Sequence, residues 1–243
     1  MEAERAREAM VERISRAQTT PAALLDAMAR VPRERFVETA PYGELPQRVD
    51  DSDVLAPATV AQLLEMAVPL PMDGARVLIV GAGVGYTAAV LAELVGAAAV
   101  HAVDIDRRLV RRARRNLHRA GYPAVLVDRA DGTEGYPLYA PYDRIIVEAA
   151  TARVPPALCA QLEPSGRLVV PLGAADQRLV SVDADGQLRD EGPEVSLAPL
   201  LAPGETTTGP ARNRTVREDS ERAAAAAHRR HGWELDWIDW SRR

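Results

Sequence analysis

The chain is short of several residue types. It contains no lysine, so all 30 basic residues among its 243 residues are arginine. A single cysteine, Cys159, excludes an intramolecular disulfide framework and is typical of a reducing compartment. Aromatic residues make up 4% of the chain and hydrophobic residues 47%, so we expect a core built mainly from alanine, valine and leucine.

Two further absences concern membranes and nucleic acid. No apolar run reaches the roughly 18 residues of a membrane-spanning helix, and the opening MEAERAREAMVERI is too charged for a signal peptide. The formal net charge of −5 argues against non-specific nucleic-acid binding, which requires a basic face. The histidines form no metal-binding constellation with acids or Cys159. We therefore expect a cytoplasmic protein without a metal ion and without a membrane or nucleic-acid partner.

From residue 75 onward, short apolar runs alternate with helical patterns. The expected strands are ARVLIV, VHAVDI, AVLVDRADG, YDRIIVEAA and GRLVVPLG, followed by a hairpin around Asp185-Gly186 and a final strand. Helices are expected over GAGVGYTAAVLAELVG, DRRLVRRARRNLHRAG and PPALCAQL. The alternation predicts an α/β fold, a doubly wound Rossmann-like sheet with parallel strands joined by right-handed crossovers.

Three regions are expected. Residues 1–74 hold three N-terminal helices. The first is expected over 2–17, the second begins after an N-cap at Thr20, and the third covers 58–68. An irregular proline-rich segment precedes the third helix. Residues 75–201 form the nucleotide-binding core. Residues 202–243 form a linker and a C-terminal extension, in which a capped helix leads to three tryptophans that we expect on one face.

The first strand-to-helix turn of the core carries three glycines, where a doubly wound sheet binds nucleotides. Gly81, Gly83 and Gly85 permit positive φ angles and close approach of a ligand. Asp104 ends the next strand and is placed to accept hydrogen bonds from ribose hydroxyl groups. A dinucleotide motif requires glycine at position 86, but this residue is Tyr86, so the pattern favours S-adenosylmethionine over NAD.

Two of these signals have simpler alternatives. A tight turn alone also selects glycine. Asp131-Gly132 follows the third strand, where an adenine amino group is read, but the pair is equally typical of an ordinary turn. The arginine-rich segment 107–119 is typical of a solvated helix face, and the alternative is a patch for an acidic peptide.

Several blocks between about residues 20 and 200 resemble the protein-L-isoaspartate O-methyltransferase family: VPRERFV, RVLIVGAGVGYTAAVLAEL, RARRNLHRAGY, DGTEGYP, APYDRIIVEAA and PPALCAQLEPSGRLVVPLG. The resemblance implies a class I methyltransferase fold, S-adenosyl-L-methionine as the methyl donor with S-adenosyl-L-homocysteine as product, and a peptide side-chain carboxylate as acceptor. We expect cofactor contacts at Val54, Leu55, Gly81, Gly83, Gly85, Asp104, Ile105, Asp131 and Gly132.

The chain departs from this family at one segment. Where the family has a sequence such as Ile-Ser-Ala-Pro-His, Leu55 stands at the serine position and Ala58 at the histidine position. The catalytic residue is therefore unknown, and the nearby polar candidates are Ser52, Asp53 and Glu148. The alternatives are that Ser52 and Asp53 cap the following turn and that Glu148 faces solvent. Asp53 and Glu148 would repel an acceptor carboxylate directly, which favours a role toward the peptide backbone, an arginine or the cofactor's amino group.

The altered segment and the extension favour a specialised enzyme. The leading hypothesis is esterification of an ordinary aspartate in a ribosomal natural-product precursor, the ester then closing to a succinimide (aspartimide). Alternatives are isoaspartyl repair, a non-catalytic cofactor-binding scaffold, and methylation of a small carboxylic acid. Arg212, Asn213 and Arg214 are predicted to bind the peptide, the alternative being that they belong to a linker.

Overall fold

The computed structural model describes residues 2–49, 52–67, 74–174 and 176–201. The predicted C-terminal helix, the three tryptophans and the candidate peptide-binding residues Arg212, Asn213 and Arg214 lie outside these ranges. The domain boundaries proposed from the sequence remain predictions.

The N-terminal region is helical, as predicted. Helix α1 covers Glu2–Ala17, α2 covers Ala22–Arg30, and a short 3₁₀ helix, η1, covers Arg33–Arg35. The predicted N-cap at Thr20 is wrong, because the cap position is occupied by Pro21, whose side chain makes no capping hydrogen bond. With φ −55° and ψ 137°, Pro21 is extended, and its carbonyl accepts from Leu24 and Leu25 as the helix begins.

The core contains a seven-stranded sheet. Its strands are β3 (Val77–Val80), β4 (Val100–Asp104), β5 (Leu126–Arg129), β6 (Tyr142–Val147), β7 (Leu162–Leu172), β8 (Gln177–Val182) and β9 (Leu188–Val195). They are ordered β5-β4-β3-β6-β7-β8-β9. The first five of this order are parallel, whereas β8 and β9 form the predicted antiparallel hairpin. Because the chain turns from β4 and β5 on one side of β3 to β6 on the other, the switch point for ligand binding lies at the end of β3.

Both faces of the sheet are buried, but the helices cover them unequally. Along β3, Val77 and Ile79 join the core formed with α3 (Pro57–Ala67), α4 (Tyr86–Val95) and α5 (Arg107–Ala120). Leu78 and Val80 point to the opposite face, where α6 (Pro156–Cys159) has only four residues. The predicted helix over PPALCAQL is shortened to Pro156–Cys159, and Leu162, the last residue of that segment, begins β7.

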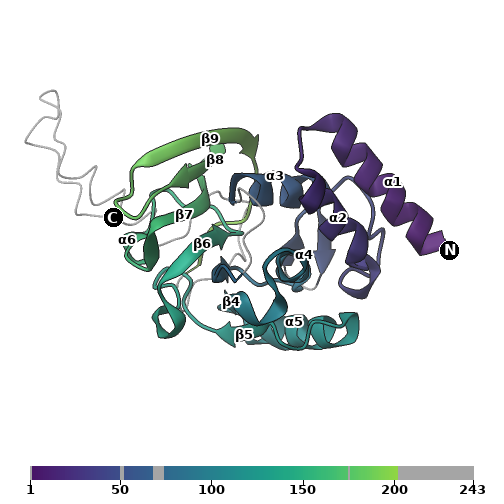
Figure 1. Ribbon diagram of the computed structural model, residues 1–243, viewed down its shortest axis with the longest axis horizontal. Helices are drawn as coiled ribbons and strands as arrows, with labels where there is room; N and C mark the ends of the chain where they lie inside the picture. Colours follow the sequence, from purple (N-terminus) through teal and green to yellow (C-terminus); the bar gives the residue numbers. More distant parts are fainter. Residues whose placement is uncertain (1, 50–51, 68–73, 175, 202–243) are drawn as a thin grey trace, which may run out of the picture.

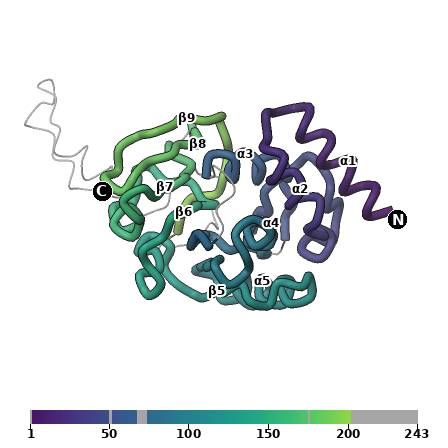
Figure 2. Tube along the Cα trace, in the orientation of Figure 1, coloured from purple at the N-terminus to yellow at the C-terminus, as the bar shows by residue number. Residues whose placement is uncertain are grey.

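The proline-rich segment contains a feature that the sequence did not predict. Strands β1 (Gln47–Val49) and β2 (Ser52–Val54) form a small antiparallel sheet directly before α3. Figure 1 shows α1 and α2 at one end of the molecule and β8 and β9 at the other, with α3 between them. The Cα trace follows the same course (Figure 2). The segment from β2 into α3 thus leads from the N-terminal helices toward the sheet.

Candidate active site

The glycine loop, residues 81–85, joins β3 to α4 and is tied to the neighbouring strand. The backbone N–H groups of Gly81 and Ala82 each donate to the carbonyl oxygen of Val103, at 2.9 Å. Gly81, Gly83 and Gly85 have φ angles of 95°, 52° and 91°, which side-chain-bearing residues rarely adopt. The sequence-based prediction of a tight, glycine-dependent turn at this position is confirmed.

The surroundings of Gly85 and Gly83 differ, so glycine is required at the two positions for different reasons. A Cβ atom on Gly85 would lie 3.2 Å from Leu117 Cγ and 3.4 Å from the Ala113 Cα atom, so glycine lets α5 pack closely on the loop. A Cβ atom on Gly83 would meet nothing within 4 Å. The loop therefore leaves open space at Gly83. A cofactor contact at this residue remains a prediction.

Asp104 is held rigidly beside this space. Its Oδ2 atom accepts a hydrogen bond from the Gly83 N–H group and its Oδ1 atom accepts one from the Asp106 N–H group, both at 2.9 Å. Burial raises the pKa of this carboxyl group, and the backbone hydrogen bonds from Asp106 and Gly83 oppose the rise. The carboxylate is thus fixed where the sequence places a ribose-binding acid.

The other predicted cofactor contacts serve local structure as well. The Ile105 carbonyl accepts a hydrogen bond from Arg129 Nε at 3.2 Å. Asp131 Oδ1 accepts from the backbone N–H and the hydroxyl of Thr133, at 2.9 and 2.7 Å, as in an ordinary turn. A Cβ atom on Gly132 would lie 2.4 Å from Val80 Cγ1, so packing alone requires glycine there. Roles for these residues toward a cofactor remain predictions.

A pocket adjoins the glycine loop. Its walls come from the end of β2 and the following residue Leu55, from the loop itself, from the start of α4, and from Arg33 and Glu148. Val54 and Leu55 are buried here, 7% and 9% exposed. Ser52 and Ala58 are not among the described residues that line this pocket. The structure therefore keeps the altered Leu55 at the site and leaves the altered Ala58 outside the wall.

Asp53 lies at this pocket but faces outward. Its side chain is 52% exposed, and it pairs with Arg48 at 3.6 Å across the two-stranded sheet. Ser52 begins β2 and is partly buried. Both residues therefore belong to a strand and do not form the turn cap that was the alternative for them.

Arg33 is a member of the site that residue-by-residue analysis of the sequence missed. Its side chain is 1% exposed, and its Nε and Nη2 atoms donate to the carbonyl oxygens of Pro41 and Leu55, at 2.7 and 2.6 Å. The guanidinium carbon lies 4.2 Å from the centroid of the Tyr86 ring. Arg33 thus fixes the backbone of Leu55 and places a positive charge against the start of α4.

Glu148 follows β6 and borders the pocket from the sheet side. Its backbone N–H donates to the Val80 carbonyl at 2.8 Å, and its Oε1 atom is shielded from solvent without a hydrogen-bond partner. Burial raises the pKa of Glu148 to about 7, although a hydrogen bond with Thr87 and the charge of Arg33 lower it. The alternative that Glu148 simply faces solvent is therefore wrong.

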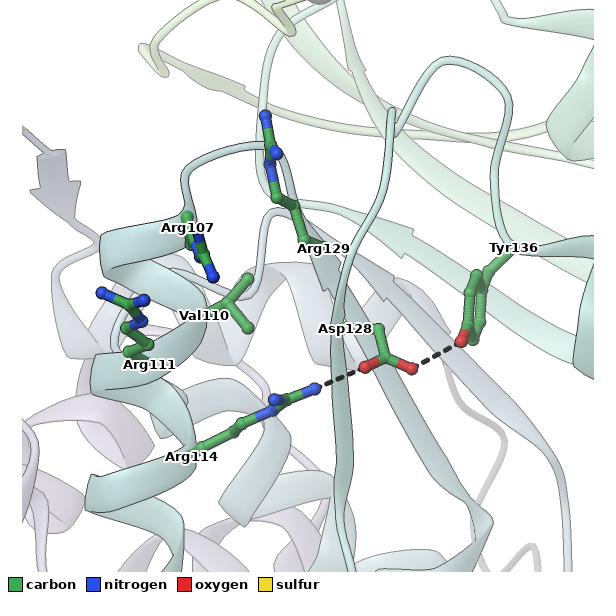
Figure 3. Close-up of a pocket in the computed structure, with 7 residues that line it drawn as sticks. All are labelled: Arg107, Val110, Arg111, Arg114, Asp128, Arg129 and Tyr136. Carbon is green, nitrogen blue, oxygen red and sulfur yellow. Dashed lines mark hydrogen bonds and ion pairs between the residues drawn. The ribbon is translucent and has the colours of Figure 1, made fainter.

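A second pocket, of about 390 Å³, lies between α5 and β5 (Figure 3). Arg107, Arg111, Arg114 and Arg129 line it, and Asp128 accepts hydrogen bonds from Arg114 and, at 2.5 Å, from the Tyr136 hydroxyl. This cluster ties α5 to β5 and to the loop that carries Asp131. It contains none of the predicted cofactor contacts and is a basic surface pocket.

Two expected absences concern the described residues alone. In this part of the chain no group of three or more histidine, cysteine, aspartate or glutamate residues is arranged to hold a metal ion. Within the same ranges, no helix has the length and apolar character to cross a membrane.

Comparison with known proteins agrees with this geometry. The chain matches the family model described as protein-L-isoaspartate(D-aspartate) O-methyltransferase over residues 5–196. The protein-L-isoaspartate O-methyltransferase of Azoarcus sp. (strain BH72) is 40% identical over 205 residues, which cover 82% of this chain and 94% of that one. Its counterpart from Methanosarcina mazei is 40% identical over 190 residues, or 73% and 76% of the two chains.

Solved structures give the same result for the fold. One protein-L-isoaspartate O-methyltransferase superposes with a TM-score of 0.69 at 27% identity, covering 79% of this chain and 65%, a little under two thirds, of that one. A putative one from Plasmodium falciparum, in complex with S-adenosyl-L-homocysteine, gives 0.72 at 19% identity, covering 80% and 98%. The fold is that of a class I methyltransferase, and the chain belongs to the protein-L-isoaspartate O-methyltransferase family of S-adenosyl-L-methionine-dependent enzymes.

Proposed function

We propose that this chain esterifies the free α-carboxylate of an isoaspartyl residue, whose peptide bond runs through the side-chain carboxyl group, in a peptide or protein. The observation that supports the proposal is the small pocket between the glycine loop and Leu55, because Arg33 and Glu148 line it beside the loop where the sequence predicts the cofactor. Arg33 supplies the positive charge at this pocket. The names of the relatives at about 40% identity support the isoaspartyl acceptor.

The residues that would hold the cofactor are the backbone of the glycine loop and Asp104. Open space at Gly83 admits a ligand, and the fixed carboxylate of Asp104 accepts hydrogen bonds from ribose hydroxyl groups. When bound, S-adenosyl-L-methionine supplies an electrophilic methyl group on a sulfonium centre. The chain's own contribution is to bring an acceptor oxygen into line with that group.

This chemistry explains why the loss of the family's serine and histidine positions is compatible with activity. An acceptor carboxylate is ionised near neutral pH and is already a nucleophile, so no general base is required. Orientation of the two reactants accounts for much of the rate, about 7–11 kcal/mol in well-aligned cases. Leu55 contributes an apolar wall that keeps water from the acceptor.

A second candidate has a specific observation in its favour. Leu55 and Ala58 remove the two polar side chains of the family segment, which indicates a changed grip on the acceptor. We therefore keep esterification of an ordinary aspartate in a dedicated precursor peptide, with closure to a succinimide, as the alternative. The family assignment and the relatives favour the isoaspartyl acceptor over it.

Two peptides that differ only in an isoaspartyl or an aspartyl linkage separate these candidates. Transfer of a labelled methyl group to the isoaspartyl peptide alone is the expected result. Transfer to the aspartyl peptide alone, with mass loss from succinimide formation, would favour the dedicated-peptide alternative. If calorimetry detects cofactor binding but neither peptide is methylated, the result would favour a non-catalytic cofactor-binding scaffold.

A further inference from the structure

The pocket beside the glycine loop concentrates polar atoms that lack partners. Among the described residues, five buried side-chain polar atoms have no hydrogen-bond partner, and three of them belong to residues of this pocket: Arg33 Nη1, Tyr86 Oη and Glu148 Oε1. Buried polar groups are normally paired, because leaving one unpaired costs about 1–3 kcal/mol. Arg33 and Tyr86 contact each other, with the guanidinium carbon 4.2 Å from the ring centroid, so Glu148 Oε1 is the atom of the three that most clearly lacks a partner.

Glu148 lines the pocket beside the glycine loop. It follows β6 at the C-terminal edge of the parallel strands, and a Cβ atom on Gly81 would lie 3.4 Å from its Cβ atom. Asp104, the predicted ribose-binding residue, ends β4 on the other side of β3 and accepts a hydrogen bond from the Gly83 N–H group. The remaining wall opposite the loop is apolar, formed by Val54 and Leu55. Besides the exposed Asp53, the ionisable side chains that line the pocket are Arg33, Tyr86 and Glu148.

The chemistry of the acceptor fits Arg33 and Glu148. A carboxylate has two oxygens, and only one of them receives the methyl group. We propose that Glu148 positions the acceptor, its neutral carboxyl group donating a hydrogen bond to the other oxygen while Arg33 balances the negative charge. This inference rests on the proposed function, since it requires a carboxylate acceptor. Glu148 would then supply a hydrogen-bond donor at a site where Leu55, at the family's serine position, supplies none.

The electrostatic surroundings of Glu148 support a neutral carboxyl group. Its pKa is raised to about 7 by burial, lowered by Thr87 and Arg33, and raised by Asp104. Tyr86, from α4, and Asp53, from β2, also line the pocket. An incoming carboxylate adds a further negative charge, which favours the protonated form of Glu148.

The proton of Glu148 is not consumed. The acceptor oxygen forms its bond to the methyl carbon as the bond from that carbon to sulfur breaks, and the electron pair stays on sulfur. Glu148 keeps its proton from acceptor binding to ester release. Glu148 is therefore a positioning residue, and its loss should raise the KM for the peptide.

The test compares Glu148→Gln and Glu148→Ala with the wild type and with Glu163→Gln, a control at the opposite end of the sheet near the start of β7. We expect the wild-type KM for the isoaspartyl peptide to rise about tenfold between about pH 6 and about pH 8.5, as Glu148 ionises and its donor is lost. The acceptor carboxylate itself is ionised throughout this range.

The two variants should then separate. Glu148→Gln keeps a donor at every pH, so its KM should stay near the wild-type value at low pH across the range. Glu148→Ala should show a KM raised about tenfold at both ends, with cofactor Kd unchanged. Glu163→Gln should follow the wild type.

Three results would overturn the inference, and they are distinguishable. If both Glu148 variants show the same pH profile and the same peptide KM as the wild type, the positioning role of Glu148 is wrong, while the proposed function stands. A weaker cofactor Kd with unchanged peptide KM would assign Glu148 to the cofactor's amino group instead. A wild-type enzyme that binds cofactor but methylates no peptide carboxylate would remove the proposed function, and the inference with it.

Discussion

Asp104 illustrates how a single residue is prepared for a ligand. Two backbone N–H groups hold its carboxylate beside the open space at Gly83. Replacing it with alanine leaves ribose hydroxyl groups without a partner, so we expect Asp104→Ala to weaken S-adenosyl-L-methionine binding by about 1–3 kcal/mol. Isothermal titration calorimetry measures this directly. Asp190→Ala, on the exposed strand β9, is the control, and equal affinities in the two variants would contradict the role.

At the same scale, the sequence predicted some site residues and missed others for a physical reason. The glycines lie in the turn between β3 and α4, and Asp104 ends the next strand, β4, so a strand-helix-strand pattern predicts their positions. Arg33 lies in a proline-rich segment and becomes a pocket residue only when its chain packs against Leu55 and Tyr86. The burial of Glu148 likewise depends on contacts with segments far away in the sequence, and no local pattern indicates it.

Among the structural elements, the glycine loop allows two neighbouring residues to be tested against each other. Alanine at Gly85 must adopt a positive φ angle and also press on Leu117, so we expect Gly85→Ala to cost about 2–4 kcal/mol of folding stability. Gly83→Ala should lower folding stability by about 1–2 kcal/mol, from the positive φ angle alone, but its side chain projects into the open space.

Denaturant unfolding and calorimetry on the two variants separate these effects. Gly83→Ala should be the more stable of the two and should lose cofactor affinity by tenfold or more (~1.4 kcal/mol). A Gly83→Ala variant with wild-type affinity would show that the open space at this residue is not part of the cofactor site. Greater instability of Gly83→Ala would contradict the packing role assigned to Gly85.

The elements themselves were predictable where their patterns are long. The parallel strands and α5 follow from continuous apolar runs and from helical periodicity between Asp106 and Gly121. The strands β1 and β2 have three residues each and carry no alternation that distinguishes them from a loop. Helix α6 ends at Cys159, and Leu162, which the sequence assigned to the helix, belongs to β7. Competition between neighbouring elements is decided by sheet pairing, which a local pattern does not contain.

For the whole molecule, the buried carboxyl of Glu148 links function to the pH dependence of folding. Its pKa is about 7 in the folded protein against an ordinary value of 4.5, so the folded state holds this proton over a range where the unfolded chain has released it. Stability from this group is therefore present below about pH 4.5 and is lost as pH rises through about 7.

We expect the cofactor-free protein to lose stability between about pH 5 and about pH 8 through this group, because ionised Glu148 is poorly solvated in the pocket. Glu148→Gln has no charge to bury, so its unfolding free energy should exceed that of the wild type at the alkaline end. The gap should close as pH falls, since both side chains are then neutral. Thermal and denaturant unfolding across this range measure the difference, with Glu163→Gln as the control for loss of a carboxylate elsewhere. A constant gap at all pH values would mean that Glu148 ionises normally, and a wild type more stable than Glu148→Gln above pH 8 would reverse the sign of its role.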